Sequence, residues 1–106
     1  MNFAVRIVNL YKHLSQNKKE NVLSKQLLRS GTSIGANYAE ATNAISKADF
    51  IAKISISLKE CTESKYWIEL LHRTEYLSGD EYESILSDCK EILALLTTTM
   101  KKSKEK

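Results

Sequence analysis

Glu69 and His72 are the pair of residues in this 106-residue chain whose types and spacing best suit metal chemistry. A Glu-x-x-His spacing brings a carboxylate and an imidazole to one face of a helix, as in the dinuclear metal sites of four-helix bundles. Such a site also needs a second Glu-x-x-His and a carboxylate from each remaining helix. The other histidine, His13, has no glutamate three positions before it. We therefore expect no metal and no other cofactor.

The chain offers nucleophilic side chains but no arrangement that would activate one. No strand-to-helix turn is predicted to present a serine beside a histidine, as hydrolase chemistry requires. Gly31 and Gly35 are not followed by the Gly-Lys-Ser or Gly-Lys-Thr of a phosphate-binding loop. Cys61 and Cys89, the two cysteines, fall at apolar positions of a helical pattern and are expected to be small core residues. The sequence therefore predicts a protein with no enzymatic activity and no small-molecule substrate.

Basic residues are the functional signal with the clearest physical content, and they gather in the first third of the chain. Residues 1–30 contain six basic residues and one acid, whereas residues 31–100 contain six and eleven, and the net charge is +3. Contact with a nucleic-acid backbone needs only an array of cations. The candidate nucleic-acid-binding residues are Arg6, Lys12, Lys18, Lys19, Lys25 and Arg29.

The scarcity of turn residues predicts long helices joined by short connections. The chain has no proline and three glycines, too few for the turns of a strand-rich fold. Apolar residues recur at helical spacing in four segments: one ends near Asn17, one spans about 21–43, one begins at a capping signal at Ser46, and one spans about 80–100. Ser78 with Glu81 is the capping signal of the last segment. Residues 1–100 are therefore expected to form one all-α, antiparallel up-down-up-down four-helix bundle.

The second helix carries Gly31 and Gly35, each unfavourable by roughly 1 kcal/mol relative to alanine in a helix. Glycines in a helix indicate that another backbone lies close by, and a kink is expected to form most easily between them. Antiparallel pairing about a turn near Ile45 sets both glycines against residues 56–60, so we expect close packing with the third helix there. The inward stripe of the second helix is expected to include Tyr38 and Ile45.

The same register sets Arg29 beside Glu60 or Glu63, which predicts an ion pair between the second and third helices. This pairing would give Arg29 a structural role. The third helix also has a second apolar strip, which is more than one packing seam needs. The strip consists of Ile56, Trp67 and Leu70.

No stretch of the chain approaches the roughly 20 apolar residues that cross a bilayer, and no signal-peptide pattern is present. A cytoplasmic protein without membrane contact is expected. Residues 101–106 are predicted to be a basic, frayed tail. Because a chain of this size buries a modest core, association with copies of itself is also expected.

A set of short motifs covers nearly the whole chain: Leu28-Arg29-Ser30 with Ser33-Ile34, Asn37, Ala39-Glu40-Ala41, Ser46-Lys47 with Asp49-Phe50, Leu58-Lys59-Glu60 and Glu63-Ser64-Lys65-Tyr66-Trp67. Together they resemble the bacterial "four helix bundle protein" family, encoded within intervening sequences of 23S ribosomal RNA genes. The resemblance implies a four-helix protomer, a ring-like homopentamer and an association with RNA. The family has no catalytic residues to carry over.

The chain is also similar, more distantly, to the accessory variability determinant of diversity-generating retroelements, a pentameric barrel that binds nucleic acid with a reverse transcriptase. Many relatives carry proline at the position of Gly35 and glycine at that of Ala41. This departure makes the expected break in the second helix softer here.

Two functions fit the sequence. The preferred one is a non-enzymatic, homo-oligomeric helical-bundle protein that binds RNA or a nucleoprotein through the basic residues of its first two helices. The alternative is a structural or adaptor module that binds another protein through an apolar or acidic surface, with no nucleic acid. The acidic candidates are Glu60, Glu63, Glu69, Asp80, Glu81 and Glu83.

Overall fold

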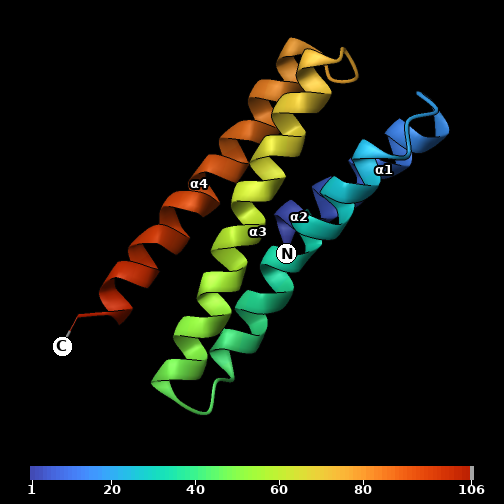
Figure 1. Ribbon diagram of the computed structural model, residues 1–106. Coiled ribbons are helices and arrows are strands. Elements are labelled where there is room, and N and C mark those ends of the chain that lie inside the picture. The colour runs from blue at the N-terminus through green and yellow to red at the C-terminus, as the bar shows by residue number, and fades with distance from the viewer. Residues whose placement is uncertain (106) are drawn as a thin grey trace.

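A computed structural model describes residues 1–105, which form four helices and no strand. The helices are α1 (Asn2–Gln16), α2 (Leu23–Thr42), α3 (Lys47–Arg73) and α4 (Gly79–Ser103). Consecutive helices run in opposite directions, as Figure 1 shows. The predicted all-α, up-down-up-down bundle is therefore confirmed.

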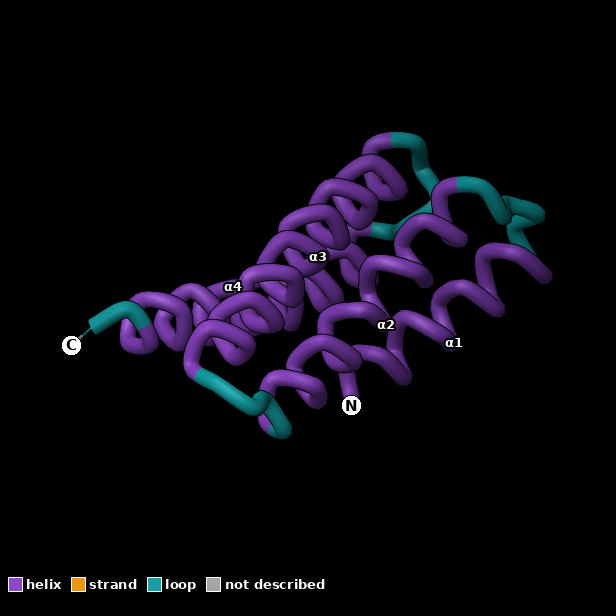
Figure 2. The backbone as a smooth tube through the Cα atoms, turned by 60° about the horizontal axis from the view of Figure 1, so that its bottom comes forward, coloured by secondary structure: helices purple, strands orange, loops and turns teal. Residues whose placement is uncertain are grey.

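The bundle is open on one side. α2 packs against both α1 and α3, and α3 packs against α4, whereas α1 and α4 touch only slightly. In Figure 1 α4, α3 and α2 follow one another across the molecule, and α1 lies partly behind α2. Figure 2 shows α1 beside α2, on the side away from α4. The molecule measures 48 × 20 × 19 Å, and α1 has 15 residues where α3 has 27. Because α1 begins beside the middle of α2, the end at which α2 joins α3 lacks a fourth helix (Figure 1).

The starts of α3 and α4 follow the predicted capping signals. The Asp49 backbone N–H donates to Ser46 Oγ at 3.0 Å, while the Asp49 carboxylate accepts from the Ile45 N–H rather than from that of Ser46. Ser78 and Glu81 form the complete reciprocal box, with distances of 3.2 and 3.0 Å. Each cap satisfies backbone donors that the first helical turn leaves without partners.

Glu20 caps the start of α2, a role that the sequence did not reveal. Its carboxylate accepts hydrogen bonds from the backbone N–H groups of Val22, Leu23 and Ser24 at 2.7–2.9 Å. Burial alone raises the pKa of this carboxyl, but the donors of Ser24, Leu23 and Val22 together outweigh burial, so the pKa lies below its ordinary value. Glu20 is only 7% exposed, and its negative charge lies against the N-terminal end of α2, where the helix dipole is positive.

The core runs between the inward faces of all four helices. Tyr38 and Ile45 were predicted to join it, but they are 49% and 94% exposed. Tyr38 lies on the half of α2 that extends past the beginning of α1, and Ile45 lies in the connection to α3. The least exposed large side chains are Ile7, Leu14, Leu27, Ile54, Ile68 and Leu71.

The predicted packing of Gly31 and Gly35 against α3 is wrong. A Cβ atom on Gly31 would lie 3.0 Å from both Cγ1 and Cγ2 of Ile7, so this glycine admits α1. A Cβ atom on Gly35 would meet nothing within 4 Å. α2 lies between two helices, and the spacing of small residues does not say which neighbour each one faces. The helix is also continuous through both glycines, so the expected break is absent.

Serines, rather than glycines, bring α2 and α3 together. The hydroxyl of Ser57 donates to the backbone carbonyl of Ile34 at 2.7 Å. Ser30 and Ser64 share a hydrogen bond between their hydroxyls at 2.8 Å. All three serines are fully buried. Short side chains that reach across the seam satisfy their own polar groups and keep the two helices in register.

The expected frayed tail is partly helical. α4 continues to Ser103, beyond the predicted end at Met100. The ammonium of Lys47 donates to the backbone carbonyl of Glu105 at 3.3 Å, which brings the chain end back to the start of α3. Residue 106 lies outside the described residues.

Candidate functional site: a lysine cluster and an apolar groove

Arg6, the first of the six candidate basic residues, joins α1 to α4. Its guanidinium forms an ion pair with the Asp88 carboxylate and donates to Ser84 Oγ at 2.9 Å. These contacts bridge the side of the bundle on which the two helices barely touch. Arg6 therefore has a structural role, because its contacts link α1 to α4.

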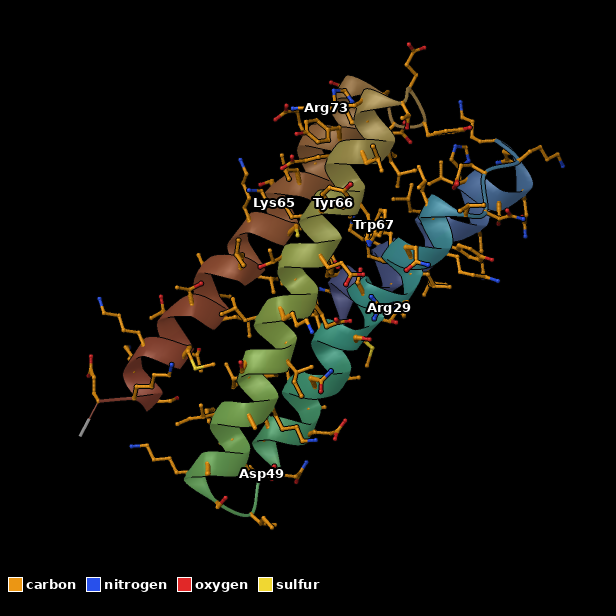
Figure 3. All side chains as sticks on the ribbon, in the orientation of Figure 1. Arg29, Asp49, Lys65, Tyr66, Trp67 and Arg73 are labelled. Atoms are coloured by element: carbon orange, nitrogen blue, oxygen red, sulfur yellow. The ribbon has the colours of Figure 1, made fainter. Side chains whose placement is uncertain are left out.

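Arg29 is engaged as well, with the partners predicted for it. It donates to Glu60 Oε2 at 2.7 Å and also pairs with Glu63 (Figure 3). The indole N–H of Trp67 donates to the same Glu63 oxygen at 3.0 Å. The Trp67 hydrogen bond and the Arg29 charge hold the pKa of Glu63 below its ordinary value, and Glu63 and Glu60 raise that of Arg29. This network joins α2 to α3 on the outside of the bundle.

The other four candidates form what we call the lysine cluster: Lys12, Lys18, Lys19 and Lys25. All four are exposed, and among residues 1–105 none has a carboxylate within ion-pair distance. They follow the chain from α1 through the connection into the first turn of α2. Because Gly31 packs beside Ile7, the antiparallel register sets Lys12 level with the beginning of α2, the part of the helix that carries Lys25.

The carboxylates near the lysine cluster already accept hydrogen bonds from backbone N–H groups. Glu20, the one acid within residues 1–30, has its carboxylate turned onto backbone N–H groups. Glu81 belongs to the cap of α4, where the Ser78 donors lower its pKa and the charges of His13 and Lys18 lower it further. Lys18 thus lies near one carboxylate, whereas Lys12, Lys19 and Lys25 are not among the charges that act on Glu81.

An apolar groove opens beside the beginning of α1, where α2 and α4 continue past it. It has a volume of about 280 Å³. Met1, Tyr38 and Leu95 at its rim are 96%, 49% and 62% exposed. The groove exists because α1 is too short to cover its neighbours. Its other lining residues are Phe3, Ala4, Ile34, Gly35, Ile92, Leu96 and Thr99.

The second apolar strip predicted on α3 is partly exposed. Of its three residues, Ile56 is 43% exposed, whereas Trp67 and Leu70 are half-buried. Tyr66, which was not part of the predicted strip, is 59% exposed and meets the edge of Trp67 with ring centroids 5.0 Å apart (Figure 3). α3 packs between α2 and α4 with its inner face, so these residues face away from the groove. We call Ile56, Tyr66, Trp67 and Leu70 the outer α3 surface.

The residues considered for catalysis serve packing. Gly31 to Gly35 spells Gly-x-Ser-x-Gly, yet it lies inside α2, and Ser33 Oγ donates to the carbonyl of Arg29 at 2.7 Å. His72 stacks on Tyr82 with ring centroids 4.0 Å apart, and its Nδ1 lies 3.2 Å from the Leu77 carbonyl oxygen.

Glu69 faces Lys65 at 3.8 Å rather than a metal-ligating partner. No three histidine, cysteine, aspartate or glutamate side chains converge on a metal-sized site within residues 1–105. Nor does any helix in that range have the length and apolar character to span a bilayer.

The fold is a small four-helix bundle that exposes the lysine cluster and an apolar groove. A family model described as "23S rRNA-intervening sequence protein" matches residues 1–98. The chain therefore belongs to the 23S rRNA-intervening sequence protein family, which confirms the resemblance found in its motifs.

A crystal structure of a protein with unknown function from the S23 ribosomal protein family of Bacteroides thetaiotaomicron is 60% identical. The match covers 94% of this chain and 93% of that one, with a TM-score of 0.93. No curated protein matches the chain.

Proposed function

We propose that this protein is a non-enzymatic, homo-oligomeric bundle that binds structured RNA through the lysine cluster. The observation that carries the proposal is the contrast among the six candidate cations. Arg6 and Arg29 are held by carboxylates, whereas the four lysines have no carboxylate partner within residues 1–105. The proposed RNA-binding surface therefore contains four of the six basic residues that the sequence suggested. The family description, which refers to 23S rRNA, supports RNA as the partner.

The chemistry of the lysine cluster suits phosphate contacts. A free ammonium that displaces counterions from a nucleic-acid backbone contributes affinity, whereas an ion-paired guanidinium must first give up its partner. Glu20 does not offset the cluster by pairing with a lysine, because its two oxygens already accept from three backbone groups. Four cations are few, so a single protomer would bind weakly.

Association of several protomers would multiply the cluster, and two surfaces support it. The apolar groove is formed by residues of α1, α2 and α4, whereas the outer α3 surface belongs to α3 alone, so the two surfaces share no residue. A contact that uses both is head-to-tail, and such contacts close into a ring when the rotation between copies permits. Five copies is the number implied by the family resemblance. A ring presents several lysine clusters to one RNA, which raises the overall affinity.

The test measures binding of a structured fragment of 23S ribosomal RNA to the intact protein at fixed salt. Replacement of Lys18, Lys19 and Lys25 by glutamate is expected to weaken binding about tenfold or more, because three phosphate contacts become repulsions. The matched control replaces three lysines elsewhere with the same change in net charge: Lys59, Lys90 and Lys102. Equal loss in both variants would show that only net charge matters and would overturn the assignment of the site.

The adaptor function predicts a different outcome. The acidic surface expected for it is largely engaged, since Glu60 and Glu63 hold Arg29 and Glu81 closes a cap. The apolar groove and the outer α3 surface are the surfaces that remain for a protein partner. An affinity pull-down that recovers one protein partner after nuclease treatment, together with no RNA binding, would favour this function over the proposal.

A further inference from the structure

Cys61 and Cys89 face each other across the seam between α3 and α4. Their sulfur atoms are 3.9 Å apart, and both residues are 0% exposed. Each thiol also lies near the partner's backbone carbonyl: Cys61 Sγ is 3.5 Å from the Cys89 oxygen, and Cys89 Sγ is 3.7 Å from the Cys61 oxygen. The two backbones are therefore separated by little more than the thickness of one cysteine side chain.

This arrangement differs from two cysteines that merely fill space in a core. Both thiols are free, and they contact each other. No third ligating side chain joins them in the described part of the chain, so the pair has no structural metal to hold. Two thiols in contact share one characteristic reaction, which is two-electron oxidation to a disulfide.

We propose that Cys61 and Cys89 form a redox site at which hydrogen peroxide produces a disulfide that joins α3 to α4. In the first step the Cys61 thiolate attacks one peroxide oxygen, the O–O bond breaks, and hydroxide leaves with a sulfenic acid on Cys61. In the second step Cys89 sulfur attacks the Cys61 sulfur, the S–O bond breaks, and water leaves. Two thiols and one hydrogen peroxide thus give one disulfide and two waters.

The order of the two residues follows from their contact. The hydrogen bond from Cys89 lowers the pKa of Cys61. The same contact, together with burial, raises the pKa of Cys89. The thiolate is the reactive form, so the shared contact favours Cys61 as the residue that peroxide oxidises and Cys89 as the residue that resolves the intermediate, and labelling of single variants decides the order. Hydrogen peroxide suits the site because it is close to water in size.

Access to the pair requires movement of α4, and the packing makes α4 the helix that moves. α4 is packed mainly on α3, and its tie to α1 is the exposed contact of Arg6 with Asp88 and Ser84. The same helix carries Ile92, Leu95, Leu96 and Thr99, which line the apolar groove. A disulfide at Cys89 therefore fixes the wall of the groove to α3, immediately before the groove begins.

The experiment uses the full-length protein under native conditions, treated with a small excess of hydrogen peroxide. The expected product is a chain that is not cross-linked to another chain and is lighter by two hydrogen atoms. Titration of thiols in the denatured product should find neither free cysteine. Melting of the oxidised protein should rise by on the order of 10 °C, because the bond closes the α3–α4 hairpin. Addition of dithiothreitol should reverse both changes.

Two variants assign the roles. In Cys89→Ser, whose hydroxyl can still donate to the Cys61 sulfur, a sulfenic-acid probe such as dimedone should label Cys61; in Cys61→Ser, the label on Cys89 should form several-fold more slowly. Circular dichroism before oxidation shows that each variant folds. Retention of both free thiols by the wild-type protein, or disulfides only between separate chains, would overturn the proposal. Equal labelling in the two variants would overturn the assignment of Cys61 as the attacking residue.

Discussion

Gly31 and Gly35 provide a matched pair of positions in one helix, and their replacement by alanine should change stability in opposite directions. At Gly35 the added Cβ meets nothing within 4 Å, so only the better helix propensity of alanine remains. The expected effect is a gain of about 0.5–1 kcal/mol in the free energy of unfolding. At Gly31 the same gain is opposed by contact with Ile7.

The magnitude at Gly31 follows from the two 3.0 Å distances. Both Cγ atoms of Ile7 would lie closer to the new Cβ than packed carbon atoms normally do, and Ile7 is 1% exposed, with little room to retreat. Overpacking of a core costs roughly 1–3 kcal/mol. Once the gain in helix propensity is included, Gly31→Ala should destabilise the protein by about 0–2 kcal/mol.

Urea denaturation followed by circular dichroism measures both variants, and a double-mutant cycle with Ile7→Ala isolates the contact. Ile7→Ala removes both Cγ atoms, so Gly31→Ala should be less harmful in that background by about 1 kcal/mol or more. If Gly31→Ala stabilises the wild-type protein as much as Gly35→Ala does, the packing of α1 on α2 described above is incorrect.

Three further predictions concern the caps, the outer network and the groove. Glu20→Gln should cost about 1 kcal/mol near neutral pH. The pKa of Glu20 is lower in the folded protein than in the unfolded chain, so its ionised carboxylate stabilises the fold at pH values above the unfolded pKa. This stabilisation is lost as the pH falls through the folded pKa. The free energy of unfolding should therefore fall less steeply with acidification in Glu20→Gln than in the wild type. Arg29→Met should lower the unfolding free energy by about 1 kcal/mol or less, because the ion pair is half exposed, and thermal melts that differ by much more would contradict this. Leu95→Asp should reduce the particle mass measured by light scattering, whereas Thr98→Asp, on the exposed face of α4, should leave it unchanged. Equal particle masses for Leu95→Asp and the wild type would exclude the groove as a contact between copies.

The helices and the caps of α3 and α4 were predictable because the signals are local. Apolar spacing and the Ser78–Glu81 box lie within a few residues of the features that they specify. The pairing of Arg29 with Glu60 and Glu63 was also predictable, since antiparallel helices joined by a short turn place residues equally distant from the turn side by side. The same reasoning about the turn near Glu75 would have set Cys61 level with Cys89.

Other features depend on information that no single segment contains. Arg6 and Asp88 come together only because the first and last helices meet, and neither residue signals the other. Gly31 lies on a helix with two neighbours, so its spacing did not identify Ile7 as its contact. The apolar groove depends on the length of α1 relative to α2 and α4, which is a property of the assembled bundle. The capping role of Glu20 requires a loop conformation that the sequence around it does not specify.

The salt dependence of RNA affinity tests the role of the lysine cluster most directly. The logarithm of the association constant should fall linearly with the logarithm of salt concentration. The slope should become shallower by about one for each of Lys18, Lys19 and Lys25 replaced by alanine and engaged with phosphate. Affinity that does not change with salt, or a slope that is the same in the wild type and the triple-alanine variant, would contradict RNA binding through this cluster.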